Sequence, residues 1–184
     1  MRGRRSQSGA TRRLVLERVL RVDESILVWV SGRSRPLTTA IMVALTRMGD
    51  ATTWFAVTLF LLASGVWDIG FRLAAAAGLG SAVAGVVKRL ARRPRPNVAI
   101  DGFEALARNP DQFSFPSGHT ATAVSVALAM VHEGVFLGWA AGGLATGVAS
   151  SRVGLGAHYP LDVLAGAALG AVTGLLARGL VPIG

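Results

Sequence analysis

Residues 161–177 of the chain read LDVLAGAALGAVTGLLA, a run in which Asp162 carries the only charge. A helix formed by this run is apolar on every side, which is typical of a helix surrounded by lipid or by other helices. Gly166, Gly170 and Gly174 recur at every fourth position. Such a small-xxx-small series lets two helix backbones approach closely within a membrane. The stretch therefore predicts a membrane helix that packs tightly against a neighbouring helix.

Five more apolar segments precede this one at short intervals. They are Pro36–Met48, Ala51–Trp67, Phe71–Val87, Thr120–Val131 and Val135–Ala149. Most are shorter than the ~20 residues that a bilayer requires, so we expect some helices to extend into polar flanks or the bilayer to thin around them. A soluble helical bundle would need long polar faces that these segments lack. The sequence predicts an all-α fold, an integral-membrane six-helix bundle within residues 36–180.

Composition agrees with this fold class. Of the 184 residues, 52% are hydrophobic and 16% are charged, and the mean hydropathy is +0.51. The length suits a single domain. The absence of cysteine excludes disulfides, thiolate metal sites and a cysteine nucleophile. A net charge of +9, with 18 arginines and a single lysine, is compatible with nucleic acid, an anionic membrane surface or an anionic substrate as partner.

The segment before the first apolar run is basic. Residues 1–13 contain five arginines and no apolar run, which predicts a basic cytoplasmic tail. Within residues 14–31, apolar side chains recur every three or four positions, with charged side chains on another face; they are Val15, Val19, Val22, Ile26 and Val30. This pattern predicts an amphipathic helix in the membrane interface, with an ordinary core-facing helix as the alternative.

A first motif ends the third apolar segment, in the string KRLARRPRP at residues 88–96. Lys88 and Arg95 stand seven positions apart, about two helical turns. Pro94 and Pro96 end the helix and force the chain away. Lysine offers a phosphate a point charge and arginine offers it a bidentate fork. Taken alone, the cluster also fits contacts with lipid headgroups or with nucleic acid.

A second motif, FPSGHT at residues 115–120, leads directly into the fourth apolar segment. Ser117 is a favourable N-cap, and Gly118 lets a ligand approach the N–H groups of the first turn. A helix N-terminus attracts anions, and His119 in that first turn would face the bound group. The simpler interpretation is that His119 is a surface residue.

A third motif, SRVGLGAHYPLD at residues 151–162, connects the last two apolar segments. Pro160 suits the first turn of a helix, which places Asp162 in that turn and His158 just before it. A carboxylate in this position can accept the Nδ1–H of His158 and leave Nε2 free to attack. Gly154 and Gly156 keep the loop tight enough to bring Arg152 alongside. The simpler interpretation is an interfacial loop with a capping aspartate.

Alternating helices would bring the three motifs to one face of the membrane. The side chains that can then share a pocket are Lys88, Arg95, Ser117, His119, Arg152, His158 and Asp162. His132 follows His119 by 13 residues, which is ~20 Å along a helix. We therefore expect His132, with Glu133, in a cytoplasmic turn on the opposite face.

The three motifs together resemble the signature of the type 2 phosphatidic acid phosphatase superfamily. The matching strings are K-x6-R-P from Lys88 to Pro96, P-S-G-H from Pro116 to His119, and S-R-x5-H-x3-D from Ser151 to Asp162. Only Arg95 has the family spacing from Lys88, so Arg92 and Arg93 are interpreted as accessory. The resemblance implies a lipid phosphatase that forms a phosphohistidine and needs no metal or other cofactor.

By this resemblance, His158 is the nucleophile, Asp162 orients it, and His119 protonates the leaving oxygen and then activates water. The phosphate ligands that it implies are Lys88, Arg95, Arg152, Ser117 and the backbone of Gly118. The substrate would be a prenyl diphosphate, phosphatidylglycerol phosphate or phosphatidic acid, held in the bilayer, and nucleic acid is not expected as a partner. Two alternatives stay open, a metal-binding hydrolase that uses the same histidines and a non-catalytic lipid-binding protein.

The expected location is the inner or plasma membrane of a bacterial cell. Nine arginines precede Pro36, which places the N-terminus in the cytoplasm by the positive-inside rule. Six spans would return the C-terminus to the cytoplasm and place the active site on the extracytoplasmic face. The connection from Lys88 to Ser117 then lies outside with six basic residues, in conflict with the same rule. Either the topology is wrong by one span or these charges serve the chemistry.

Overall fold

The computed structural model describes residues 3–107, 111–131 and 134–181, and these residues form helices and loops without a β-sheet. The helices are α1 (Gly3–Ser31), α2 (Pro36–Arg47), α3 (Ala51–Ala63), α4 (Trp67–Ala91), α5 (Pro96–Ala99), α6 (Gly118–Ala129), α7 (Val135–Gly154) and α8 (Pro160–Leu180). The predicted all-α class is confirmed. The turn predicted at His132 and Glu133 lies outside the described residues.

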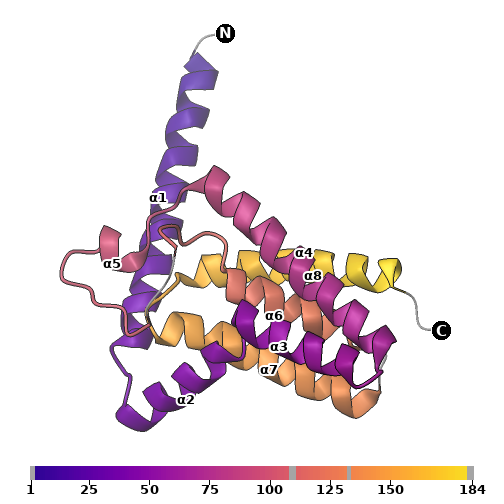
Figure 1. Ribbon diagram of the computed structural model, residues 1–184. Helices are drawn as coiled ribbons and strands as arrows, with labels where there is room; N and C mark the ends of the chain where they lie inside the picture. Colours follow the sequence, from indigo (N-terminus) through magenta and orange to yellow (C-terminus); the bar gives the residue numbers. More distant parts are fainter. Residues whose placement is uncertain (1–2, 108–110, 132–133, 182–184) are drawn as a thin grey trace.

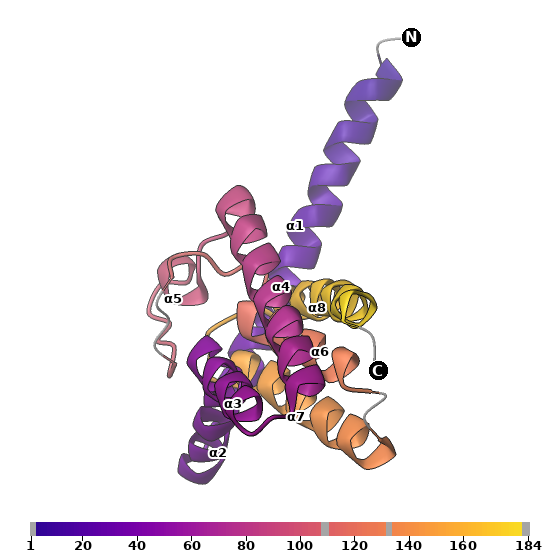
Figure 2. The same cartoon turned by 45° about the vertical axis from the view of Figure 1, so that its right-hand side comes forward.

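Helices α3, α4, α6, α7 and α8 form the bundle, and α6 lies at its centre (Figure 1). Helix α6 packs against α4, α7 and α8, an arrangement that is also visible in the second view (Figure 2). Most of its residues are small or β-branched and buried, including Ala121, Ala123 and Val126. The ends of α4 and α7 and the beginnings of α6 and α8 meet at one end of the bundle.

The glycine series of α8 packs against the backbone of α6, as the sequence predicts. A Cβ atom added at Gly166 would collide with the carbonyl oxygen of Ser117. At Gly170 and Gly174 it would collide with the carbonyl oxygens of Ala121 and Ser125. Only glycine permits this approach, because any side chain would occupy the space of the neighbouring backbone. The series therefore fixes the beginning of α8 beside the beginning of α6.

The outer surface of the bundle is apolar. Large side chains that are exposed on it include Phe55, Phe60, Trp139, Leu164 and Leu176. Within the described residues, α4 and α8 are the two helices long and apolar enough to cross a membrane, while α3 is apolar but shorter. A broad exposed apolar surface on a helical bundle suits contact with lipid.

Helix α2, the first of the six predicted spans, packs against α7. At its beginning, the Ser34 hydroxyl donates to the Gly154 carbonyl at 3.3 Å, and near its end Thr46 accepts a hydrogen bond from Arg152. Both ends of α2 therefore lie beside the last turns of α7. An arginine flanks each end of α2, and its contacts place it at the end of the bundle that carries Arg152.

Helix α1 crosses the same end of the bundle (Figure 1). It begins at Gly3, so the segment predicted as a basic tail and the helix predicted from residue 14 form one continuous helix. Arginine, alanine and glutamine are good helix formers, which explains the earlier start. The predicted apolar stripe, including Val15, Val19 and Val22, is exposed, whereas Asp23 and Leu27 are buried.

Candidate active site

The residues of the three motifs gather at the end of the bundle where α1 and α2 lie. Lys88 is in the last turn of α4, Arg95 precedes α5, and Ser117 and His119 begin α6. Arg152 is in the last turn of α7, whereas His158 and Asp162 flank the beginning of α8. Each polar side chain thus stands at a helix end, where it can face a common site while the helix bodies remain apolar.

His158 is buried and faces a guanidinium group. Its exposed fraction is 1%, and its Nε2 lies 3.4 Å from Nη1 of Arg95. Burial, followed by the positive charges of Arg152, Arg95 and Lys88, lowers the pKa of His158 well below 6.5. The ring is therefore neutral near pH 7. Because a guanidinium group only donates, this contact favours the tautomer with a lone pair on Nε2 and a proton on Nδ1.

Asp162 lies beside His158 without a hydrogen bond between them. Oδ2 of Asp162 is 3.6 Å from Nδ1 of His158, too long for such a bond. Nδ1 has no hydrogen-bond partner within the described part of the chain. Oδ2 instead accepts the backbone N–H of Tyr159 at 3.0 Å, and Oδ1 accepts from Arg93 at 2.8 Å. The predicted contact is thus present as a close approach, and the carboxylate is held by Tyr159, Arg93 and the Ser114 side chain.

Lys88 and Arg95 share the carboxylate of Asp111. Nζ of Lys88 lies 2.6 Å from Oδ2, and Nη2 of Arg95 pairs with Oδ1. Burial opposes ionisation of this carboxyl group, but its hydrogen bonds from Lys88 and Arg95 outweigh that effect and lower its pKa below 3.8. An anionic group therefore bridges the two cations that the sequence predicts as phosphate ligands.

The other two predicted catalytic and binding side chains contact the segment around the beginning of α3. Nε2 of His119 lies 2.7 Å from Oδ1 of Asp50, the residue that precedes α3. Nη1 of Arg152 donates to the hydroxyl of Thr46. Asp50 and Thr46 belong to none of the three motifs, so the sequence does not predict them as residues of the site.

Ser117 and Gly118 have the structural places that the second motif predicts. Ser117 is the N-cap of α6, and its Oγ accepts from the N–H of Thr120. Its own N–H donates to the carbonyl of Asp162 at 2.9 Å, which joins the second motif to the third. A Cβ atom at Gly118 would meet nothing within 4 Å. This open side faces a cavity of about 160 Å³ that Lys88, Asp111 and His119 also line.

Together, three cations, two histidines and a buried carboxylate at one end of an apolar helical bundle define an all-helical membrane protein with an anion site. The sequence profile of the PAP2 superfamily matches residues 69–182. The chain therefore belongs to the PAP2 superfamily, as its three motifs predict. All eight predicted site residues lie inside the matched range, whereas Asp23, Thr46 and Asp50 lie before it.

Relatives of the chain are named as phosphatases. It is 38% identical over 115 residues to decaprenylphosphoryl-5-phosphoribose phosphatase of Mycobacterium tuberculosis, an alignment that covers 55% of each chain. It is 31% identical to an undecaprenyl-diphosphatase of Sulfolobus acidocaldarius, over 71% of this chain and 64% of the relative. The chain thus spans about half to two thirds of these relatives.

Solved structures share the fold. A transmembrane PAP2-type phosphatidylglycerolphosphate phosphatase from Bacillus subtilis superposes with a TM-score of 0.77 at 26% identity, over 88% of this chain and 85% of the other. LpxE of Aquifex aeolicus superposes with a TM-score of 0.74 at 24% identity, over 84% and 93% of the two chains. The second likeness concerns the fold alone.

Proposed function

We propose that this protein is an integral-membrane lipid phosphatase that hydrolyses a phosphomonoester or diphosphate through a phosphohistidine and without a metal ion. The observation that carries this proposal is the contact of Arg95 with Nε2 of His158, a neutral imidazole surrounded by cations. A neutral ring has the lone pair that attack on phosphorus requires, and the cations offset the charge of the phosphoryl oxygens.

In the first step, Nε2 of His158 forms a bond to phosphorus while the bond from phosphorus to the leaving oxygen breaks. His119, whose protonated form would be stabilised by the Asp50 carboxylate at 2.7 Å and by the bound phosphate, gives its proton to that oxygen, so the lipid product leaves neutral or as its lower phosphate. Neutral His119 then takes a proton from water, whose oxygen attacks phosphorus and displaces His158. The products are inorganic phosphate and the restored enzyme, and His119 carries its proton again.

In this mechanism, Asp162 stabilises the positive charge that His158 acquires during attack. Its Oδ2 already lies 3.6 Å from Nδ1 of His158, and such contacts commonly shorten when substrate binds. Lys88, Arg95 and Arg152 would hold the phosphoryl oxygens, together with the Ser117 hydroxyl and the N–H of Gly118. The substrate phosphate would then replace the Asp111 carboxylate between Lys88 and Arg95.

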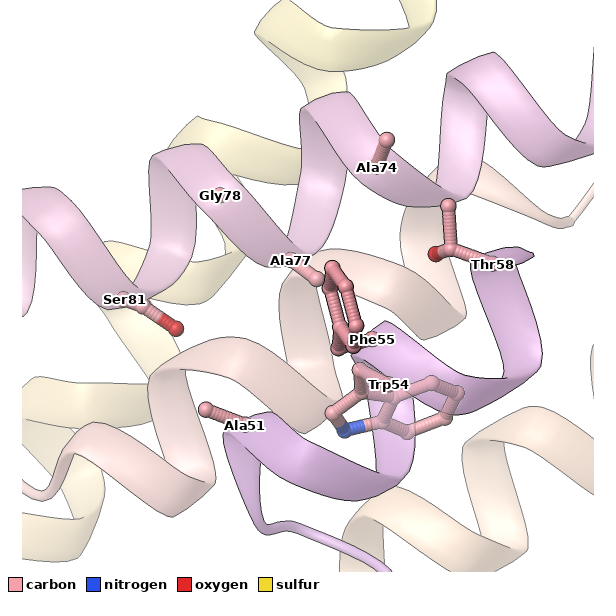
Figure 3. A pocket seen from close by; sticks show the side chains of 8 residues that line it. All are labelled: Ala51, Trp54, Phe55, Thr58, Ala74, Ala77, Gly78 and Ser81. Carbon is pink, nitrogen blue, oxygen red and sulfur yellow. The ribbon is translucent and has the colours of Figure 1, made fainter.

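An apolar cavity beside the site supports a lipid substrate. The polar cavity at Lys88 and His119 shares two lining residues, Ala51 and Ser81, with a second cavity of about 290 Å³. Figure 3 shows this second cavity between α3 and α4, where Trp54, Phe55 and Ala77 line it. A single lipid could thus place its headgroup in the first cavity and its hydrocarbon chain in the second. A water-soluble phosphate ester would leave the apolar cavity between α3 and α4 empty.

The candidate substrates are lipid phosphates of the kinds that the relatives' names contain. A prenyl phosphate or diphosphate is the first choice, because decaprenylphosphoryl-5-phosphoribose phosphatase and undecaprenyl-diphosphatase are among the relatives. Phosphatidylglycerol phosphate is the second, because the Bacillus subtilis neighbour is a phosphatase of that lipid. Phosphatidic acid is the third, from the motif resemblance.

The charge distribution supports a cytoplasmic active site rather than the extracytoplasmic one that six spans predict. With five helices running along the bundle and α1 and α2 at one end, the N-terminus lies on the side of the active site. Among the basic residues that the structure describes, only Arg72 and Arg178 belong to the opposite end of the bundle. The positive-inside rule then favours the cytoplasm for the site and for α1.

Purified protein in detergent micelles should release inorganic phosphate from a prenyl diphosphate in the presence of EDTA. The His158→Ala variant should lose at least ~10³-fold in kcat, because it lacks the nucleophile. If an acid-labile phosphorylated protein can be trapped from wild type but not from this variant, that result would support the phosphohistidine intermediate. Loss of wild-type activity in EDTA, with recovery on adding a divalent metal, would instead support a metal-dependent hydrolase. Unchanged release by His158→Ala would contradict the assigned nucleophile.

A further inference from the structure

A buried carboxylate of α1 reaches the catalytic motifs from outside the part of the chain that matches the family profile. Asp23 is 3% exposed. Its Oδ2 lies 2.7 Å from Nη2 of Arg93, and its Oδ1 accepts the backbone N–H of Leu161 at 2.8 Å. Arg93 in turn donates from Nη1 to Oδ1 of Asp162 at 2.8 Å. A chain of short contacts therefore runs from α1 to the carboxylate beside His158.

The contact with Leu161 has a local reason. The first N–H groups of a helix have no partner within the helix, and Leu161 is the second residue of α8. A carboxylate that accepts such an N–H also interacts favourably with the positive end of the helix dipole. Figure 1 shows α1 passing across this end of α8. Asp23 thus connects α1 to the helix that carries Asp162.

Arg93 is held in one position by three neighbours. Its two Nη atoms bind different carboxylates, and its guanidinium group lies 3.9 Å above the ring of Tyr159. Tyr159 also donates its backbone N–H to Oδ2 of Asp162. Both oxygens of Asp162 are thereby fixed, with Oδ2 on the side of His158.

The charges of this cluster suit a histidine nucleophile. Asp162 and Arg93 alone would form a neutral pair, which would stabilise a positive imidazole weakly. With Asp23 included, two carboxylates share one guanidinium group, so the cluster beside His158 is net negative. This negative charge attracts the positive charge that the imidazole acquires when Nε2 bonds to phosphorus, and buried surroundings strengthen the attraction.

We propose that Asp23 and Arg93 are positioning residues of the phosphatase, which act on His158 through Asp162. Arg93 fixes the carboxylate of Asp162, and Asp23 keeps the cluster net negative and seats α1 against the site. This inference rests on the proposed function, because it assigns the two residues a part in the attack by His158. It also gives α1 a place in the active site.

The test compares Asp23→Asn with Glu17→Gln in the full-length protein. Both variants remove one negative charge from α1, but Glu17 is exposed and Asp23 is buried. Asparagine keeps an oxygen for the N–H of Leu161 and loses the charge. Asp23→Asn should lower kcat about tenfold with little change in KM, an effect typical of partners that orient a functional histidine. Vanadate, which mimics the five-coordinate transition state, should inhibit it about tenfold more weakly, whereas Glu17→Gln should behave as wild type.

A purely structural role for Asp23 predicts a different result. Asp23→Asn would then lower the thermal stability and the yield, while kcat per active site and the vanadate inhibition constant stayed at wild-type values. Active sites are counted from the burst of product in the first turnover, so a partly unfolded sample does not mimic slow chemistry. Asp23→Glu, which keeps the charge, should recover more kcat than Asp23→Asn. Equal activities of these two variants would contradict the proposal, whereas an inactive wild type would contradict the proposed function itself.

Discussion

At the scale of single residues, the convergence of the motif residues at one end of the bundle was predictable, and their acidic partners were not. The motif spacing identifies Lys88, Arg95 and His158, because phosphate chemistry needs cations and a nucleophile in one place. Asp50 and Asp111 lie near loops with no periodic pattern, so the sequence offers no reason to pair them with His119 or Lys88. Asp23 does carry a signal, since it stands one turn from both Val19 and Leu27 on a helix. An acid in that position is costly unless a buried partner accepts its charge.

The carboxylate of Asp111 pairs with Lys88 and Arg95, the two cations to which we assign the substrate phosphate. Asp111→Asn should therefore lower both KM for the lipid phosphate and the inhibition constant of inorganic phosphate by ~3- to 10-fold. The reason is that Lys88 and Arg95 would be paired with an internal carboxylate in a smaller fraction of the protein. Steady-state kinetics with added phosphate measure both constants. Asp101→Asn, an exposed change in the same loop, is the matched control. An increase in KM would show instead that Asp111 arranges Lys88 and Arg95 for binding.

At the scale of helices, the packing of α8 on α6 was predictable from the glycine spacing, while the lengths of the helices were less so. The repeat at Gly166, Gly170 and Gly174 indicates one close contact, and the structure identifies α6 as the neighbour. Helix α1 is longer than predicted, because arginines interrupt an apolar pattern without interrupting a helix. The sequence predicted α2 as a spanning helix from its apolar residues alone. The contacts of Ser34 and Thr46 place both ends of α2 beside the last turns of α7, which its apolar residues alone do not predict.

Gly170→Ala should destabilise the protein by ~1–3 kcal/mol, because the added methyl group would meet the carbonyl of Ala121 and force α6 and α8 apart. Thermal unfolding in detergent, followed by circular dichroism, measures the change. Gly179→Ala is the control within the same helix, since a Cβ there meets nothing within 4 Å. That variant should match wild type or gain a little stability from the better helix propensity of alanine. Equal melting temperatures for the two variants would contradict the assigned close contact.

At the scale of the whole molecule, the arrangement that we propose, with α2 at one end of the bundle, would remove the conflict between six spans and the positive-inside rule. In that arrangement two crossing helices, α3 and α4, separate the basic α1 from the basic connection after α4, which places both on the same side. The sequence could not reveal this, because the segment at α2 is as apolar as a short span. Contacts from Ser34 and Thr46 to the end of α7 are what distinguish the two arrangements.

Cysteine labelling tests this topology, since the chain has no cysteine of its own. A membrane-impermeant maleimide should label Ser64→Cys, at the far end of the bundle, in intact cells or spheroplasts. It should label Asp101→Cys, at the active-site end, only after the membrane is opened. Both positions are exposed, so accessibility within the protein is matched. Labelling of Asp101→Cys in intact cells would place the active site outside.

The cavity between α3 and α4 would also determine how the proposed lipid substrate reaches the site. Phe55 at this cavity is 70% exposed on the outer face of the bundle, so a lipid that enters there comes from the surrounding bilayer. Encounters then depend on two-dimensional diffusion in one leaflet. The quantity that governs the rate is the mole fraction of substrate in that leaflet, and diluting it with inert lipid slows the enzyme even when the bulk concentration is constant.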